Sequence, residues 1–303
     1  MKRKVAIFFV IIIFLAGLSI MLYPVISSFV NNLNYRDSMA GYVEGVAQLE
    51  DESITNFFKE ADDYNKSLTG NMILTDPFDE EAYKSIGAGY ESTFDVDDSG
   101  LIGYIEIPKL NVYLPISHGT SEEVLKNGAG HLQNTSFPVG GESTHSVISA
   151  HTGFPGKTFF DYIVDLELGD EFYIYVLNRT LKYKVDDIVV ILPHETENLR
   201  IRTGEDYVTL LTCTPYGINS HRLLVRGTRV EYTPDETITA SDVKPISMDK
   251  SCMYLFGYKI PYWTAICIVG GFVILVIIIV AVAVKSSRSK SEKEATTAEN
   301  KEE

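Results

Sequence analysis

Cysteine is scarce in this sequence, and its placement differs from that in disulfide-rich secreted domains. The 303 residues contain three cysteines, which are Cys213, Cys252 and Cys267. A disulfide framework would place an even set of cysteines within the globular part of the chain. That part holds only Cys213, with Cys252 at its edge. The sequence therefore argues against a framework, while a single Cys213–Cys252 bridge remains an alternative.

Metal-ligand clusters and an excess of basic residues are also missing. No histidines, cysteines and carboxylates stand together at the spacing of a zinc site, so we expect no metal, and nothing else implies a cofactor. The formal net charge is −15; the first 30 residues contribute +3 and residues 285–303 contribute zero, which leaves −18 for the middle. This acidity argues against nucleic acid as a partner, because its recognition needs a basic face.

Charged residues are absent from two long apolar runs. Residues 5–23 follow a basic start that ends at Lys4, and residues 262–284 precede Lys285. Each run is long enough to cross about 30 Å of hydrocarbon as a helix. For the first run a cleaved signal peptide is the alternative, although no small-x-small cleavage site follows it. Since basic residues flank both outer ends, the positive-inside rule predicts cytoplasmic termini and an extracytoplasmic middle.

The chain between these runs changes its pattern near residue 100. Residues 37–68 carry apolar side chains at a spacing typical of one or two amphipathic helices, with a break near Asp51. Seven or more short β-rich runs follow, which predicts a sandwich or a closed barrel. The expected organisation is a cytoplasmic stub at 1–4, a span at 5–23, a helical preface with an extended loop at 31–99, a β domain at 100–232, a linker at 233–261, a span at 262–284 and a disordered tail at 285–303.

Cys213 ends the strand-like run DYVTLLTC, next to Thr-Pro and a Gly-Asn turn. A lone cysteine at such a position is often a buried filler of the core. The strand end favours a surface cleft instead, and an unpaired thiol outside the cell is open to oxidation, so its presence needs a reason. Cys213 is therefore a candidate nucleophile, which would need a base or ion-pair partner to become a thiolate.

Two residues are candidate partners of this thiol. His151 ends the run THSVISAH at a strand-to-loop transition like that of Cys213, so we favour it over His145, which begins the same run. Arg222 stands nine residues after Cys213 and could return beside it to bind an oxyanion, although a surface arginine is the alternative. The other histidines lie in turn-like polar contexts, where we expect solvated or capping roles: His118, His131, His194 and His221.

Several stretches together resemble the class C, pilus-assembling sortases. They are YIEIPKLNVYLPISHGTSEEVL, GAGHLQNTSFPVGGESTHSVISAHTG and LLTCTPYGINSHRLLVRGTR, and the similarity extends over residues 35–285. The resemblance implies a mainly β fold, with a closed eight-stranded sortase-type barrel, a helical preface with a lid loop, and two flanking transmembrane helices. It also implies that Cys213 is the nucleophile, that His151 is the acid/base, and that Arg222 steadies the oxyanion or orients the substrate.

The resemblance extends to a lid, with one local departure. The triplet Asp76-Pro77-Phe78 matches the lid of this class, a loop that lies over the cysteine and histidine. Around the histidine the class often reads SGHRG, whereas this chain has Ala150 and Thr152 on either side of His151. The departure puts the groove wall and the substrate preference in doubt.

The activity that the resemblance implies is a membrane-anchored cysteine transpeptidase outside a Gram-positive cell. It would cleave an LPxTG-like sorting signal between Thr and Gly through a thioester, and pass the acyl group to a pilin lysine. The expected partners are pilin subunits and surface proteins with such signals, and no cofactor is implied. A sortase that mainly anchors proteins to the cell wall, and a non-enzymatic membrane-tethered β module, are the alternatives.

Overall fold

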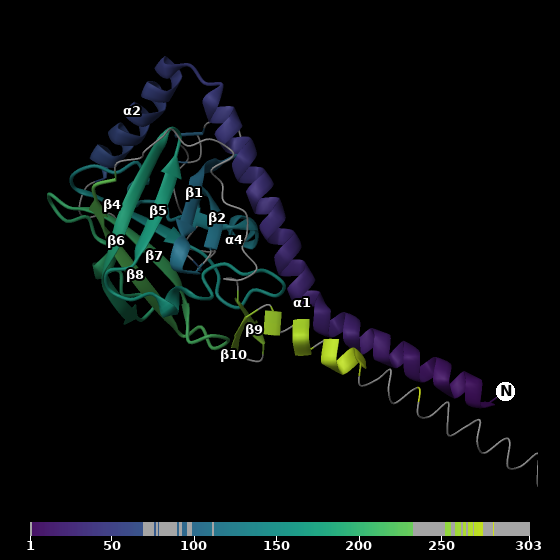
Figure 1. Cartoon of the computed structure of the whole chain (residues 1–303). Helices are drawn as coiled ribbons and strands as arrows, with labels where there is room; N and C mark the ends of the chain where they lie inside the picture. The colour runs from purple at the N-terminus through teal and green to yellow at the C-terminus, as the bar shows by residue number, and fades with distance from the viewer. Residues whose placement is uncertain are drawn as a thin grey trace, which may run out of the picture. The chain divides into compact units, whose positions relative to one another are not determined.

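The structure is a computed structural model of the whole chain, shown in Figure 1. It forms two units, Met1–Ile246 and Ser247–Glu303. The residues it describes are 2–68, 76, 78, 90, 93–95, 99–110, 112–232, 252–255, 258–261 and parts of 263–281.

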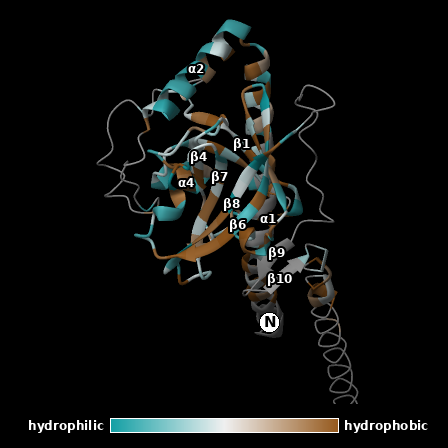
Figure 2. Ribbon diagram, turned by 90° about the vertical axis from the view of Figure 1, so that its left-hand side faces the viewer, coloured by the Kyte–Doolittle hydropathy of each residue, from teal (hydrophilic) through white to brown (hydrophobic). Residues whose placement is uncertain are grey.

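Two helices precede the β domain and meet at a sharp bend (Figure 1). Helix α1 spans Lys2–Ala47 and α2 spans Asp51–Ser67, so the helical break falls where the sequence predicts it, next to Asp51. Acidic residues in the first turn of α2 suit the positive end of the helix dipole. The ribbon of α2 is largely hydrophilic in Figure 2, and its buried side chains recur at helical spacing: Ile54, Phe58, Ala61 and Asn65.

The β domain is a closed barrel of eight strands in the order β1-β2-β3-β4-β7-β8-β6-β5, so the predicted barrel is confirmed. Its inward side chains alternate with outward ones, as the burial of every second residue in β5 illustrates. The short helix α4, Glu122–Asn127, lies between β2 and β3. The strands are β1 Leu101–Ile107, β2 Val112–His118, β3 Ala129–His131, β4 Thr144–Ser149, β5 Glu171–Val176, β6 Arg179–Ile191, β7 Asp206–Thr214 and β8 His221–Val230.

Strand direction determines where the candidate residues meet. Strands β4 and β7 are parallel neighbours, so their C-terminal ends reach the same rim of the barrel. Strand β8 is antiparallel to β7, so the start of β8 lies at that rim too. The functional candidates fall at these three strand ends.

One expectation about local structure is wrong, and one segment contains strands that the sequence did not predict. His118 and His131 are buried rather than solvated, because the imidazoles bond to backbone carbonyl groups and pack on Phe137. The predicted linker contains an antiparallel hairpin, formed by β9, Cys252–Leu255, and β10, Tyr258–Pro261. Aromatic and β-branched residues in this segment favour a strand pair.

The two predicted membrane spans are supported by the sequence alone. None of the helices in the described part of the chain is sufficiently long and apolar to cross a membrane. Residues 262–284 are described only in part.

Asn65 attaches α2 to the barrel through two buried bonds to one residue. Its Oδ1 accepts from the Phe137 N–H at 2.7 Å, and its Nδ2 donates to the Phe137 carbonyl at 3.3 Å. Asn65→Ala would leave both buried backbone groups without these partners, so we expect the free energy of unfolding to fall by about 1–3 kcal/mol. Chemical denaturation would measure the loss. Thr55→Ala is the control, because its exposed hydroxyl bonds within α2, and an equal loss in both variants would contradict the prediction.

Candidate active site

Cys213 and Arg222 lie directly opposite each other on neighbouring strands. The antiparallel register of β7 and β8 pairs Cys213 with Arg222 and Thr214 with His221, as the nine-residue spacing suggests. Cys213 is a free thiol, so it does not form the alternative disulfide with Cys252. Both side chains are largely buried, with 9% of Cys213 and 8% of Arg222 exposed.

His151 reaches the same rim from β4. The last ladder pair of β4 and β7 joins Ser149 to Leu211, and the Ala150 N–H donates to the Leu211 carbonyl at 3.2 Å. His151 stands two residues beyond Ser149, and Cys213 stands two residues beyond Leu211. Because the strands are parallel, this equal offset brings the imidazole and the thiol to neighbouring positions.

Two phenyl rings pack near the His151 ring. Its centroid lies 5.5 Å from that of Phe78 and 5.4 Å from that of Phe154, and the Phe154 ring is stacked on it. Burial lowers the pKa of His151, and Lys126 lowers it further, while Glu122 opposes the shift. The neutral imidazole is therefore favoured at neutral pH in this state.

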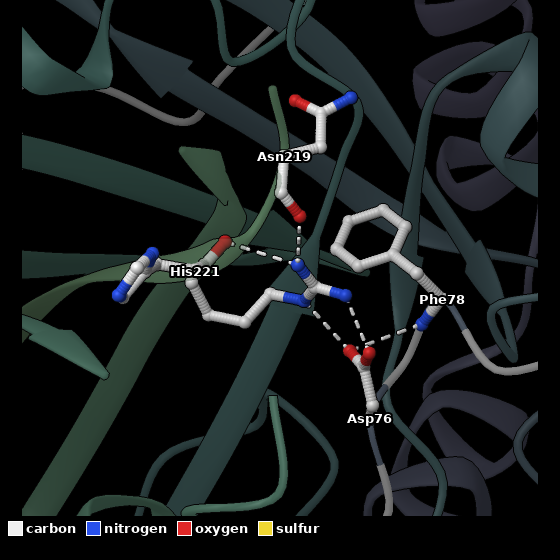
Figure 3. Close-up of polar contacts among 5 residues, drawn as sticks. Asp76, Phe78, Asn219 and His221 are labelled. Atoms are coloured by element: carbon white, nitrogen blue, oxygen red, sulfur yellow. Dashed lines mark hydrogen bonds and ion pairs between the residues drawn. The ribbon is translucent and has the colours of Figure 1, made fainter. Parts of the chain in front are cut away.

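Asp76 forms a two-pronged ion pair with Arg222 (Figure 3). The Arg222 Nε donates to Asp76 Oδ1 at 2.8 Å, and its Nη2 donates to Asp76 Oδ2 at 2.5 Å. The Phe78 N–H donates to Asp76 Oδ1 at 3.4 Å, and the guanidinium carbon lies 5.1 Å from the centre of the Phe78 ring. Two members of the predicted lid triplet therefore contact the candidate site. The third, Pro77, lies outside the described residues.

The remaining guanidinium donors of Arg222 point to the β7–β8 connection. Its Nη1 donates to the carbonyl oxygens of Asn219 and His221, each at 3.0 Å (Figure 3). A guanidinium has five N–H donors, and the bonds to Asp76, Asn219 and His221 together use four of them. The contacts fix the orientation of Arg222, and Asp76 binds its Nε and Nη2.

The thiol is held in its neutral form in this state. Burial raises the pKa of Cys213 to about 11, Asp76 adds to the rise, and Arg222 opposes it. The Asp76 carboxylate also offsets the positive charge of the arginine that would otherwise favour a thiolate. A neutral thiol therefore stands beside a neutral imidazole, which is the resting form of a cysteine–histidine pair rather than its reactive form.

The other candidates do not join this site. His145 is buried: its Nδ1 donates to the Arg200 carbonyl at 3.0 Å, and its Nε2 accepts from the Thr209 hydroxyl at 2.7 Å. Burial lowers its pKa to about 4. Sequence reasoning missed Phe154, although an aromatic residue three positions after His151 is a detectable signal. Among the described residues, no three His, Cys, Asp or Glu side chains gather as a metal site would require.

Known proteins with related sequences and structures are sortases. Residues 105–230 match the sortase domain family. Sortase D of Bacillus subtilis (strain 168) is 27% identical over 143 residues, which cover 46% of this chain and 69% of that protein. The match to Sortase A of Bacillus anthracis is 29% identical and covers 44% of this chain and 61% of that protein.

Solved structures give longer matches at higher identity. A sortase C-1 from Streptococcus pneumoniae is 44% identical with a TM-score of 0.61, and the match covers 65% of this chain and 100% of that one. A pilus-related sortase C of Group B Streptococcus is 44% identical with a TM-score of 0.58, and the match covers 63% of this chain and 96% of that one. This chain therefore belongs to the sortase family of cysteine transpeptidases, and within it to class C.

Proposed function

We propose that this chain polymerises pilin subunits by cysteine-dependent transpeptidation. The observation that carries the proposal is the meeting of Cys213, Arg222 and His151 at three strand ends of one barrel rim. The substrate is an LPxTG-like sorting signal, and the acceptor is a lysine amine of another pilin subunit. The pilus-related sortase C of Group B Streptococcus, similar over most of its length, supports this choice of substrate.

The first half of the reaction forms a thioester. The Cys213 thiol first passes its proton to His151, and the resulting thiolate attacks the carbonyl carbon between Thr and Gly to form a tetrahedral oxyanion. As the C–N bond breaks, the protonated His151 gives its proton to the departing glycine amine. The acyl group then remains on Sγ of Cys213.

The second half transfers the acyl group to the acceptor. A neutral lysine amine attacks the thioester carbonyl, and the neutral His151 takes the proton that the amine loses. The C–S bond breaks, which regenerates the thiolate and leaves an isopeptide bond. Atoms and charges therefore return to the starting enzyme, and the reaction needs no cofactor.

Arg222 would stabilise the oxyanion in both halves once Asp76 has moved away. In the described state two of its N–H groups bind the Asp76 carboxylate, so these two donors are not available to a developing negative charge. The lid must therefore open before the arginine can serve the reaction. We assign Asp76 and Phe78 to the closed lid on these contacts, and Pro77 on its place in the triplet.

The proposed location is the cell membrane, with the barrel outside the cytoplasm. Residues 5–23 and 262–284 would anchor the chain, and the basic residues beyond each run would keep both termini in the cytoplasm. This placement brings the site to substrates that have already crossed the membrane.

Identifying the acceptor amine tests the proposal. The full-length chain would be incubated with a sorting-signal peptide, a pilin domain and a cell-wall peptide that carries a free amine, and the joined product mapped by mass spectrometry. We expect an isopeptide bond to a pilin lysine, and its loss when that lysine is replaced by arginine. A product joined only to a cell-wall peptide amine would contradict polymerisation and favour wall anchoring.

A further inference from the structure

Side chains, not the strand ladder, make the last attachments between the His151 segment and the strand of Cys213. The ladder of β4 and β7 ends at Ser149 and Leu211, followed by the bond from the Ala150 N–H. Beyond it, the Thr212 hydroxyl donates to the Ala150 carbonyl at 2.7 Å. The Thr152 hydroxyl oxygen lies 2.7 Å from that of Thr212. These contacts join the residues that precede and follow His151 to the residue before Cys213.

The direction of the two bonds follows from proton counting. A carbonyl oxygen cannot donate, so the single hydroxyl proton of Thr212 goes to Ala150. The short Oγ1–Oγ1 contact then requires Thr152 to be the donor. The Phe160 carbonyl, at 3.4 Å from the Thr152 oxygen, is a longer second acceptor for the same proton. The chain of bonds therefore runs from Thr152 through Thr212 to the Ala150 carbonyl, and each bond polarises the next.

Neighbouring bonds hold the rest of this segment without fixing its distance from β7. The Phe160 N–H donates to the His151 carbonyl at 3.1 Å, and the Gly153 N–H donates to Asp161 Oδ1 at 2.8 Å. These partners belong to the loop that follows His151. The Phe78 and Phe154 rings pack near the imidazole but belong to other segments than β7. Only the hydroxyl chain, among these contacts, connects the segment directly to β7 next to Cys213.

We propose that Thr152 is a positioning residue for the transpeptidation reaction, and that its hydroxyl, acting through Thr212, sets the separation of the His151 imidazole from the Cys213 thiol. The inference rests on the proposed function, because it concerns proton transfer between those two side chains. Thr152 is also where the chain departs from the SGHRG pattern, and an arginine there could not form the same short hydroxyl pair.

Thr152→Val tests the proposal, since valine keeps the branched shape and removes the hydroxyl. A misplacement of about 1 Å near the reacting groups can cost about a hundredfold in rate. We therefore expect kcat for acyl transfer from a sorting-signal peptide to fall at least about tenfold, with KM changed less than about twofold. Thr152→Ser, which retains the hydroxyl, should recover most of kcat. The rates would be measured on the full-length chain, with and without Asp76→Ala, so that lid opening does not limit them.

Thr144→Val is the matched control, because Thr144 is a buried threonine at the far end of β4 whose hydroxyl bonds the Gly141 carbonyl. It should change thermal stability as Thr152→Val does while leaving kcat unaltered. If Thr152→Val does not fold, Thr152→Ala carries the same test without added bulk. An unchanged kcat in the valine or alanine variant, or a serine variant as slow as the valine variant, would overturn the positioning role. Failure of the unsubstituted chain to form any thioester would instead overturn the proposed function.

Discussion

Replacing Cys213 with alanine is expected to abolish both the acyl-enzyme and the joined product. The thiol supplies the atom that carries the acyl group, and an alanine methyl cannot form a thioester. The barrel should persist, because Cys213 lies at a strand end and its ladder bonds to β8 use the backbone. Intact-protein mass spectrometry after incubation with a sorting-signal peptide would detect the acyl-enzyme. A chromatographic assay would follow the product.

Cys267→Ala provides the same substitution at a cysteine that is exposed and free. It should leave both measurements unchanged, which separates loss of the nucleophile from a general effect of removing a thiol. A Cys213→Ala protein that still joined peptide to pilin at a detectable rate would show that another group carries the acyl chain. The three-residue site would then need a different chemical role.

The Cys213–Arg222 pair was within reach of sequence reasoning because it depends on local pattern. Period-2 alternation defines the two strands, and a short polar turn between them returns the second antiparallel to the first. The nine-residue spacing then allows Arg222 to return to the Cys213 end of the sheet, and the structure pairs the two residues directly. The eight-stranded closure was accessible only through the resemblance, because alternation alone does not distinguish a sandwich from a barrel.

The contacts around His151 could not be predicted in the same way. Phe154 and Thr152 acquire their roles from the path of a loop, and no periodic pattern encodes that path. The buried state of His131 also escaped, since its surrounding sequence is polar and turn-like. Burial there depends on Ser136 and on the stacked Phe137 ring, which the tertiary fold brings to the imidazole. The composition of the neighbouring sequence predicts burial poorly when the side chains that cover a residue are brought to it by the tertiary fold.

Asp76 links the lid to the ionisation of the thiol, and this link has a direction. Burial is the largest cause of the raised pKa of Cys213, and the Asp76 charge is a further cause. Removing the Asp76 carboxylate would reduce the burial of the thiol and eliminate the nearby negative charge. The positive charge of Arg222 would then favour the thiolate. The pKa of Cys213 should therefore fall from about 11 toward its ordinary range. Each unit of that fall increases the thiolate fraction about tenfold at any pH below the new value.

Asp76→Ala is accordingly expected to speed labelling of Cys213 by a thiol reagent at neutral pH by at least about tenfold. The midpoint of the labelling rate against pH should move to a lower pH than in the unsubstituted chain. Mass spectrometry at timed intervals would give the rates, with Cys252→Ala and Cys267→Ala in both proteins to remove the other two cysteines. Phe78→Ala should act in the same direction, because the phenyl ring contacts both Arg222 and His151.

Asp186→Ala is a matched control on β6, the strand that pairs with β8. Asp186 forms a two-pronged pair with Arg226 on β8, at 3.0 Å for each bond, but Arg226 lies four residues from the Cys213 partner. Loss of that carboxylate should leave the labelling of Cys213 unchanged, although it also removes an arginine–aspartate pair. Equal labelling in the Asp76 and Asp186 variants would mean that the Asp76 contact does not restrain the thiol. If labelling of Cys213 is faster only in the Asp76 variant, this one carboxylate controls both access to the thiol and its ionisation.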